Sequence, residues 1–168
     1  YLEFTVETPP GSPAHEGLGK LGAPRLDAHA PTFRKAAKAR KVDDAFLRAI
    51  AHAERGFDEK AVSPKGAQGL MQLMPDVQRD YGVLDPFDPA QSIDAAARHL
   101  RALLARYKGD DGWAAAADNA GIGTLTRDRG IPPYAETIAY VAKGQALHAR
   151  YRTAMKLPPL DHPLRAAQ

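Results

Sequence analysis

The chain has 168 residues, of which 44% are apolar and 26% charged, and it contains no cysteine. This length suits one domain with a short appendage, and it is long enough to form a hydrophobic core without disulfides or a structural metal. The lack of cysteine excludes thiol catalysis, iron–sulfur clusters and cysteine-ligated zinc, and a net charge of +3 favours an anionic partner without choosing among nucleic acid, anionic lipid and acidic glycan.

Residues 1–31 have the composition of an arm or of the remnant of a neighbouring module. Residues 1–6 alternate apolar and polar side chains, as a half-buried strand does, but no second strand pattern follows them. Residues 9–31 are rich in Gly and Pro, which is typical of a linker. Because the sequence begins with Tyr1, we expect a processed form or a fragment whose export signal is not part of it. No apolar run reaches the ~20 residues that a transmembrane helix needs.

Every later segment with a clear hydrophobic period has the helical one. The first such segment, residues 32–41, carries Arg34, Lys38 and Lys41 on one face. That face is either a phosphate-contacting patch or, because no aromatic residues are interleaved with it, an ordinary solvated surface. Further helices are expected over residues 44–55, 63–74, 92–107 and 136–155.

Local signals set the limits and the inward faces of these helices. One of the two Asp residues at 43–44 caps the second helix, and Ser63–Pro64 begins the third, which ends before Pro75. The residues expected to face inward in the last two helices are Ile93, Ala97, Leu100, Leu104 and Tyr107, followed by Thr137, Val141, Leu147 and Tyr151. We therefore predict an all-α domain of about six or seven helices over residues 32–157, with a tail at 158–168.

One carboxylate occupies the apolar face of the helix expected over residues 44–55. Phe46, Ile50 and Glu54 recur at a spacing of four residues and so share that face. The polar side of the same helix carries Arg48, His52 and Arg55. Apolar surroundings disfavour the charged form of a carboxylate, which is what a general acid near neutral pH requires. The alternative is that the helix ends before Gly56 and that Glu54 points past the core into water.

The segments that follow supply amides, small residues and aromatics. Ser63 and Gln72 flank two glycines, and an Asn-Ala-Gly stretch begins at Asn119. Each of these segments alone could be an ordinary capped junction. Together with an acid they suit a sugar polymer, whose hydroxyl and N-acetyl groups need polar partners and whose rings need apolar surfaces.

From about Phe33 to Tyr151 the sequence resembles the catalytic domain of the soluble lytic murein transglycosylases, which has the goose-type lysozyme-like fold. In family order and spacing, the matching blocks are Glu54 followed by Phe57, residues 61–67, 69–75, 85–89, 119–121 and 131–134, and Glu136–Thr137. The resemblance implies an all-α lysozyme-like fold, peptidoglycan glycan strands as the partner, and the bacterial periplasm, with outer-membrane attachment through a missing N-terminus left open. It implies no cofactor, no metal and no nucleic acid, and we expect a monomer.

The resemblance also assigns roles to single residues. Glu54 would be the sole catalytic acid/base: it would protonate the oxygen between N-acetylmuramic acid and N-acetylglucosamine and then accept the proton of the muramyl 6-hydroxyl, leaving a 1,6-anhydromuramoyl end. The residues at substrate-binding positions of the family are Ser63, Gln72, Met74, Asn119 and Glu136. Two of them have ordinary alternatives, since Met74 could be core and Glu136 a helix N-terminal acid favoured by the macrodipole.

Two residues depart from the family pattern. Arg55 stands where the family usually has Ser, and Asp118 stands where it has a Tyr whose hydroxyl helps to hold the acid. Asp118 could keep Glu54 protonated through its own negative charge, or act as a base for water and make the enzyme a hydrolase. In a third interpretation the site is degraded and the domain only binds glycan.

Features of two other classes of protein also occur in the sequence. The His-x-Glu triplet at residues 52–54 echoes zinc deaminases, but their site also needs cysteines, so no metal is expected. A nucleic-acid-binding domain would depend on the basic residues of 32–41, and a peptidoglycan-binding scaffold module would depend on the effect of Asp118.

Overall fold

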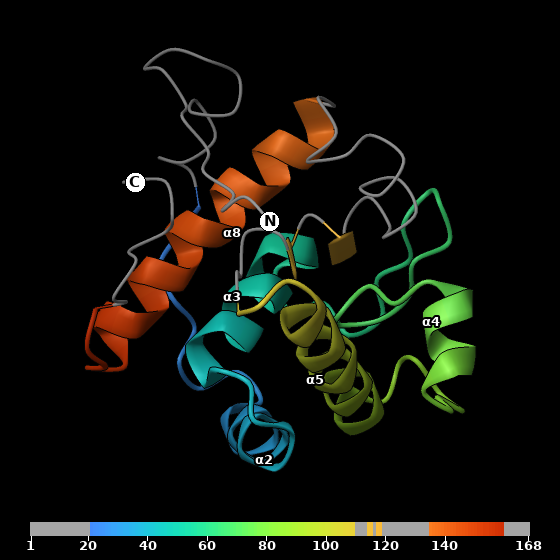
Figure 1. Ribbon diagram of the computed structural model, residues 1–168. Helices are drawn as coiled ribbons and strands as arrows, with labels where there is room; N and C mark the ends of the chain where they lie inside the picture. Colours follow the sequence, from blue (N-terminus) through green and yellow to red (C-terminus); the bar gives the residue numbers. More distant parts are fainter. Residues whose placement is uncertain (1–20, 110–113, 116, 119–134, 160–168) are drawn as a thin grey trace. The chain divides into compact units, whose positions relative to one another are not determined.

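The computed structural model describes residues 21–109, 114–115, 117–118 and 135–159. Its helices are α2 (Ala30–Arg40), α3 (Asp44–Arg55), α4 (Pro75–Asp80), α5 (Pro89–Arg106) and α8 (Ala135–Ala154) (Figure 1). Within these ranges β-structure is limited to two isolated bridges, Val62 with Gln68 and Gln68 with Leu73. The predicted all-α class is confirmed, with five helices in the described residues against the six or seven predicted for the domain. None of these helices is long and apolar enough to span a membrane.

The chain divides into two compact units. One comprises Arg25–Ala102 and contains α2, α3, α4 and most of α5, whereas the other joins Tyr1–Pro24 to Leu103–Gln168 and contains α8. The predicted domain limits at 31/32 and 157/158 stay a prediction.

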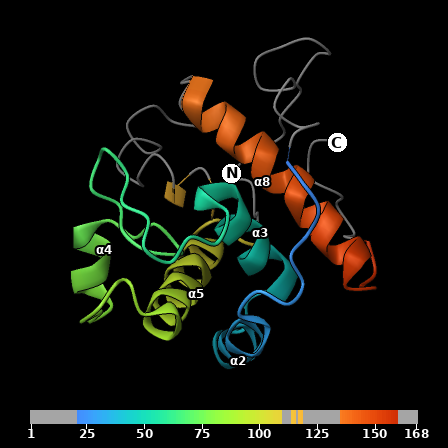
Figure 2. The same ribbon diagram turned by 180° about the vertical axis from the view of Figure 1, so that it is seen from behind.

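In the first unit α2 packs against α3 (Figure 1 and Figure 2). The inner face of α2 consists of Phe33, Ala36 and Ala37, all buried. Asp43 precedes α3 as the N-cap residue in an extended conformation, but its side chain makes no capping hydrogen bond. The apolar positions Phe46 and Ile50 of α3 are 4% and 1% exposed, as predicted.

The prediction that Arg48 lies on a polar side of α3 was wrong. Its side chain is 4% exposed, and its guanidinium pairs with Asp44 one turn earlier at 2.7 Å. It also donates to the carbonyl oxygens of Leu26 (3.0 Å) and Ala30 (3.5 Å). The segment before α2 therefore covers this side of α3, and its carbonyl oxygens accept hydrogen bonds from the buried guanidinium. The hydrophobic period of α3 alone does not reveal such a cover.

The prediction of a helix over residues 63–74 was also wrong. The N–H of Ser63 donates to the carbonyl of Ala67 (2.9 Å), and the Oγ of Ser63 accepts from the N–H of Ala67 (3.0 Å), so Ser63 closes a turn instead of capping a helix. Gly69 has a φ of +82°, and a side chain there would collide with the carbonyl oxygen of Pro86. Pro75, expected to end a helix, begins α4, because proline lacks the N–H that the first helical turn leaves unbonded.

The inward faces expected of the two long helices are confirmed where they are described. In α5 Ile93, Ala97 and Leu100 are at most 1% exposed, although Leu103 is buried in place of the expected Leu104. The predicted residues described in α8 are fully buried, namely Val141, Leu147 and Tyr151.

Candidate active site

Glu54 lies in the last turn of α3, directly before the helix ends at Arg55. Its side chain is half-buried, whereas the neighbouring Ala53 is 5% exposed and Arg55 is exposed. Both sequence interpretations therefore hold in part: Glu54 continues the face of buried apolar residues, and the helix ends immediately beyond it. A carboxyl group at such an edge is shielded on one side and accessible on the other, as a general acid needs to be.

Two consecutive left-handed residues turn the chain sharply after α3. Gly56 has a φ of 59° and Phe57 a φ of 67°, a conformation that costs a non-glycine residue about 1–2 kcal/mol. Phe57 is nevertheless held there, because its ring is 8% exposed and packs edge-on against Phe33 at 6.1 Å and His52 at 5.6 Å between centroids. Burial of this ring offsets the backbone strain and fixes the direction in which the chain leaves Glu54.

A second anchor of this turn comes from the segment before α2. Arg25 donates a hydrogen bond to the carbonyl oxygen of Gly56 (2.8 Å), and its guanidinium carbon lies 5.8 Å from the centroid of the Phe57 ring. His29 Nε2 and Glu59 Oε2 are 3.5 Å apart just beyond. Sequence reasoning missed Arg25 and His29, since both lie in the stretch assigned to an arm and neither belongs to a recognisable pattern.

The loop between α3 and α4 presents one oriented amide. Gln72 has a φ of 52°, and its Nε2 donates to the carbonyl oxygens of Ala61 (3.1 Å) and Gly69 (2.8 Å). Because both partners are acceptors, the amide nitrogen must face the loop and Oε1 must face outward. Gln72 thus offers a hydrogen-bond acceptor to a ligand, and Ser63, whose Oγ already accepts from Ala67, retains its O–H as a donor.

Apolar side chains accompany these polar groups at the surface. Met74 is 39% exposed and Val62 is 55% exposed, so the alternative that Met74 belongs to the core was wrong. Exposed apolar side chains such as these suit contact with sugar ring faces. In the described ranges, no group of three or more His, Asp or Glu side chains could hold a metal ion.

The remaining predicted site residues lie in the other unit. Asp118 is half-buried in a short helical stretch, and Asn119 lies outside the described residues. Glu136 is the second residue of α8, and its side chain is likewise outside the description. The roles assigned to these three residues stay predictions.

Residues 31–140 match the family model described as the transglycosylase SLT domain. The chain belongs to the transglycosylase SLT domain family. The matched range contains Glu54, the loop with Gln72 and all the other predicted site residues, so the sequence resemblance to the lytic murein transglycosylases is confirmed.

Named relatives of this SLT domain agree with that assignment. Membrane-bound lytic murein transglycosylase F 1 of Alkalilimnicola ehrlichii is 38% identical over 123 residues, which are 66% of this chain and 25% of the relative. Membrane-bound lytic murein transglycosylase F of Alcanivorax borkumensis is 39% identical over 82 residues, which are 49% of this chain and 18% of the relative. The chain thus spans a quarter or less of the length of these relatives.

Solved structures of the family share the fold. The lytic transglycosylase Slt of Pseudomonas aeruginosa, an inactive Glu-to-Gln mutant, superposes with a TM-score of 0.72 at 26% identity, covering 82% of this chain and 25% of that one. The 70 kDa soluble lytic transglycosylase of Escherichia coli gives a TM-score of 0.70 at 25% identity, covering 80% and 25% of the two chains. The lysozyme-like helical fold implied by the sequence is therefore confirmed.

Proposed function

We propose that the chain is the catalytic domain of a lytic murein transglycosylase, with Glu54 as its only general acid/base. The observation that carries the proposal is the half-buried carboxyl group at the last turn of α3, followed by a turn that Phe57 and Arg25 hold in place. The names of the relatives support the reaction, and the inactive Glu-to-Gln mutant among the solved structures supports a single essential glutamate.

The proposed reaction needs one carboxyl group of the protein. Protonated Glu54 gives its proton to the glycosidic oxygen between N-acetylmuramic acid and N-acetylglucosamine while the bond from that oxygen to C1 breaks. The 6-hydroxyl oxygen of the same muramyl residue then bonds to C1, and its proton returns to Glu54. The product carries a 1,6-anhydromuramoyl end and no water is consumed, so the second carboxylate of an ordinary glycosidase is not required.

The loop residues would orient the sugars beside this acid. The outward Oε1 of Gln72 suits the N–H of an acetamido group, and the hydroxyl of Ser63 suits an acetamido carbonyl or a sugar oxygen. The exposed Met74 would contact a ring face. Asn119 and Glu136 are proposed to complete the site, in line with their family positions. A murein substrate would put the protein in the bacterial periplasm, and we propose that it acts there on glycan strands as a monomer.

Incubation with purified murein sacculi, followed by mass analysis of the released fragments, tests the proposal. We expect anhydro ends from the wild-type chain and none from Glu54→Gln, with Asp80→Asn as a matched change of an exposed carboxylate that retains activity. Reducing ends would indicate the hydrolase in which Asp118 activates water. Binding to sacculi without release would indicate a glycan-binding module.

A further inference from the structure

The charges of the unit Arg25–Ala102 are strongly segregated. Residues 34–41 contain five Lys or Arg and no acidic residue, whereas the rest of the unit contains eight basic and eleven acidic residues. The net charge of the unit is therefore small, although α2 is positive and the rest of the unit is negative. Such a charge distribution orients a molecule in the field of an anionic surface.

The positive charges of α2 lie on its outer side. Because Phe33, Ala36 and Ala37 are buried, the opposite side of the helix faces solvent. Four exposed residues form what we call the α2 cationic face, namely Arg34, Lys35, Lys38 and Lys41. Among the residues that the structure describes, none of these four has an acidic partner.

The fifth cation of the helix behaves differently. Arg40 points toward α5 and pairs with Asp94 through two hydrogen bonds of 2.9 and 3.2 Å. Asp94 is thus paired with Arg40 and does not neutralise any residue of the α2 cationic face. Like charges crowded on one turn repel each other, so the face favours any anion that approaches.

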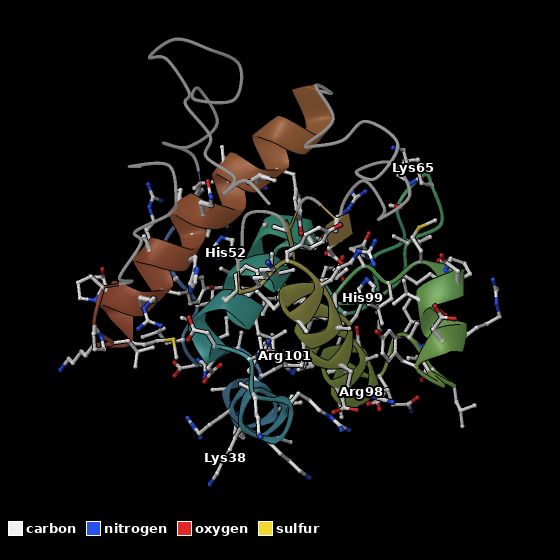
Figure 3. The ribbon with its side chains drawn as sticks, viewed as in Figure 1. Lys38, His52, Lys65, Arg98, His99 and Arg101 are labelled. Atoms are coloured by element: carbon white, nitrogen blue, oxygen red, sulfur yellow. The ribbon has the colours of Figure 1, made fainter. Side chains whose placement is uncertain are left out.

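The α2 cationic face lies at the opposite end of its unit from the loop between α3 and α4, residues 56–74, which we call the active-site loop. In Figure 3, Lys38 projects from α2 at one end of the unit, and Lys65, which belongs to the loop between α3 and α4, lies at the other. A glycan strand seated beside that loop would therefore not cover α2. An anion that binds α2 would therefore be distinct from the strand being cleaved.

We propose that the α2 cationic face docks the protein onto a bilayer surface rich in anionic phospholipid headgroups. Several Lys and Arg residues on one helix face suit such a surface, to which each cation contributes about 1 kcal/mol. Since the apolar side of α2 is buried in the protein, the helix lies on the headgroups and inserts nothing. Docked in this way, the unit turns its active-site loop away from the bilayer.

Two other polyanions fit the face less well. Single-stranded nucleic acid is usually held by aromatic side chains between the cations, and α2 has its only aromatic residue, Phe33, fully buried. The peptide carboxylates of the murein strand being cleaved would lie beside the active site, at the other end of the unit. A planar anionic surface meets all four cations at once.

Vesicle sedimentation with the full 168-residue chain tests the proposal. We expect binding to phosphatidylcholine vesicles containing about one-third phosphatidylglycerol, little binding to pure phosphatidylcholine, and loss of binding as salt rises above ~0.15 M. The variant Arg34→Glu/Lys35→Glu/Lys38→Glu should bind about a hundredfold more weakly. The control Lys60→Glu/Arg79→Glu/Lys156→Glu makes the same change in net charge at exposed positions elsewhere and should stay within about twofold.

Circular dichroism and thermal unfolding establish whether both variants are folded. If the α2 variant is not folded, Arg34→Gln/Lys35→Gln/Lys38→Gln replaces it. Equal losses in the two triple variants would overturn the proposal, because net charge alone would then explain binding. So would equal affinity for the two kinds of vesicle. Retention on DNA or on sacculi, lost in the α2 variant while vesicles are ignored, would assign the face to another polyanion.

Discussion

Arg25 Nη1 lies 2.8 Å from the carbonyl oxygen of Gly56 and donates a hydrogen bond to it. The bond spans 31 positions of sequence and ends two residues after Glu54. A cation at this place satisfies a carbonyl that the end of α3 leaves unbonded and complements the negative end of the helix dipole. The segment before α2 is therefore part of the support of the candidate acid.

Replacing Arg25 by Ala should slow turnover without unfolding the protein. We expect kcat on sacculi to fall about three- to tenfold with little change in KM, because the bond positions the acid and does not touch substrate. Arg25→Lys, which can still donate to the Gly56 carbonyl, should recover part of the loss. Arg79→Ala removes an exposed arginine from α4 and serves as the control. A change in KM alone would contradict the positioning role.

Replacing Arg48 by Met should destabilise the fold strongly. The change keeps much of the side chain's volume but leaves Asp44 and two main-chain carbonyls without their donor in a nearly buried site. We expect the free energy of unfolding, measured by urea titration, to fall by about 3 kcal/mol. Arg40→Met breaks the pair with Asp94, whose side chains are 41% and 40% exposed, and should cost far less. Equal losses would show that the burial of Arg48 is energetically unimportant.

Two glycines of the active-site loop make a matched pair. Gly66 and Gly69 both have positive φ, but a Cβ at Gly66 would meet open space, whereas one at Gly69 would strike the carbonyl oxygen of Pro86. Gly66→Ala should therefore cost only backbone strain, about 1 kcal/mol, and Gly69→Ala a further 1–3 kcal/mol. Thermal unfolding of the two variants checks this order. The reverse order would mean that the loop moves away from Pro86 at no cost.

Gln72→Glu should impair the site strongly although it changes few atoms. The new oxygen would face the carbonyl oxygens of Ala61 and Gly69, to which the amide now donates, and acceptors cannot bond to acceptors. We expect kcat/KM on sacculi to fall at least about tenfold. Gln72→Asn keeps the donor, tolerates positive φ and should be less impaired. Full activity of Gln72→Glu would rule out the proposed orientation of the amide.

The long helices and the position of Glu54 followed from the sequence, because hydrophobic period and family blocks are local signals. The segment after Glu54 did not, since its shape depends on distant groups. The N–H of Met71 donates to the buried Oγ of Ser92 (3.2 Å), and Gln78 Nε2 donates to Gln68 Oε1 (3.0 Å) and to the carbonyl oxygen of Leu73 (2.8 Å). These contacts outweigh a helical apolar spacing that the left-handed Gly69 would in any case interrupt.

Arg48 and Arg25 show the second limit of sequence reasoning. Helical phase placed Arg48 with solvent-facing residues, but an irregular segment covers that side and supplies carbonyl oxygens to it. An irregular segment of this kind has no hydrophobic period, so the sequence pattern does not reveal which helix face it covers. Only the three-dimensional path of residues 25–30 shows why these two arginines matter.

The close approach of Gly69 to Pro86 bears on which length changes the domain tolerates. The two residues fix the ends of a stretch that includes α4 and the turn at Gly82, beside which Leu84 is 93% exposed. Lengthening a surface turn costs little, since the entropy of loop closure grows only with the logarithm of its length. Insertions near Gly82 should therefore be accepted, whereas one added residue next to Gly69 or Pro86 would displace the close contact between these two residues.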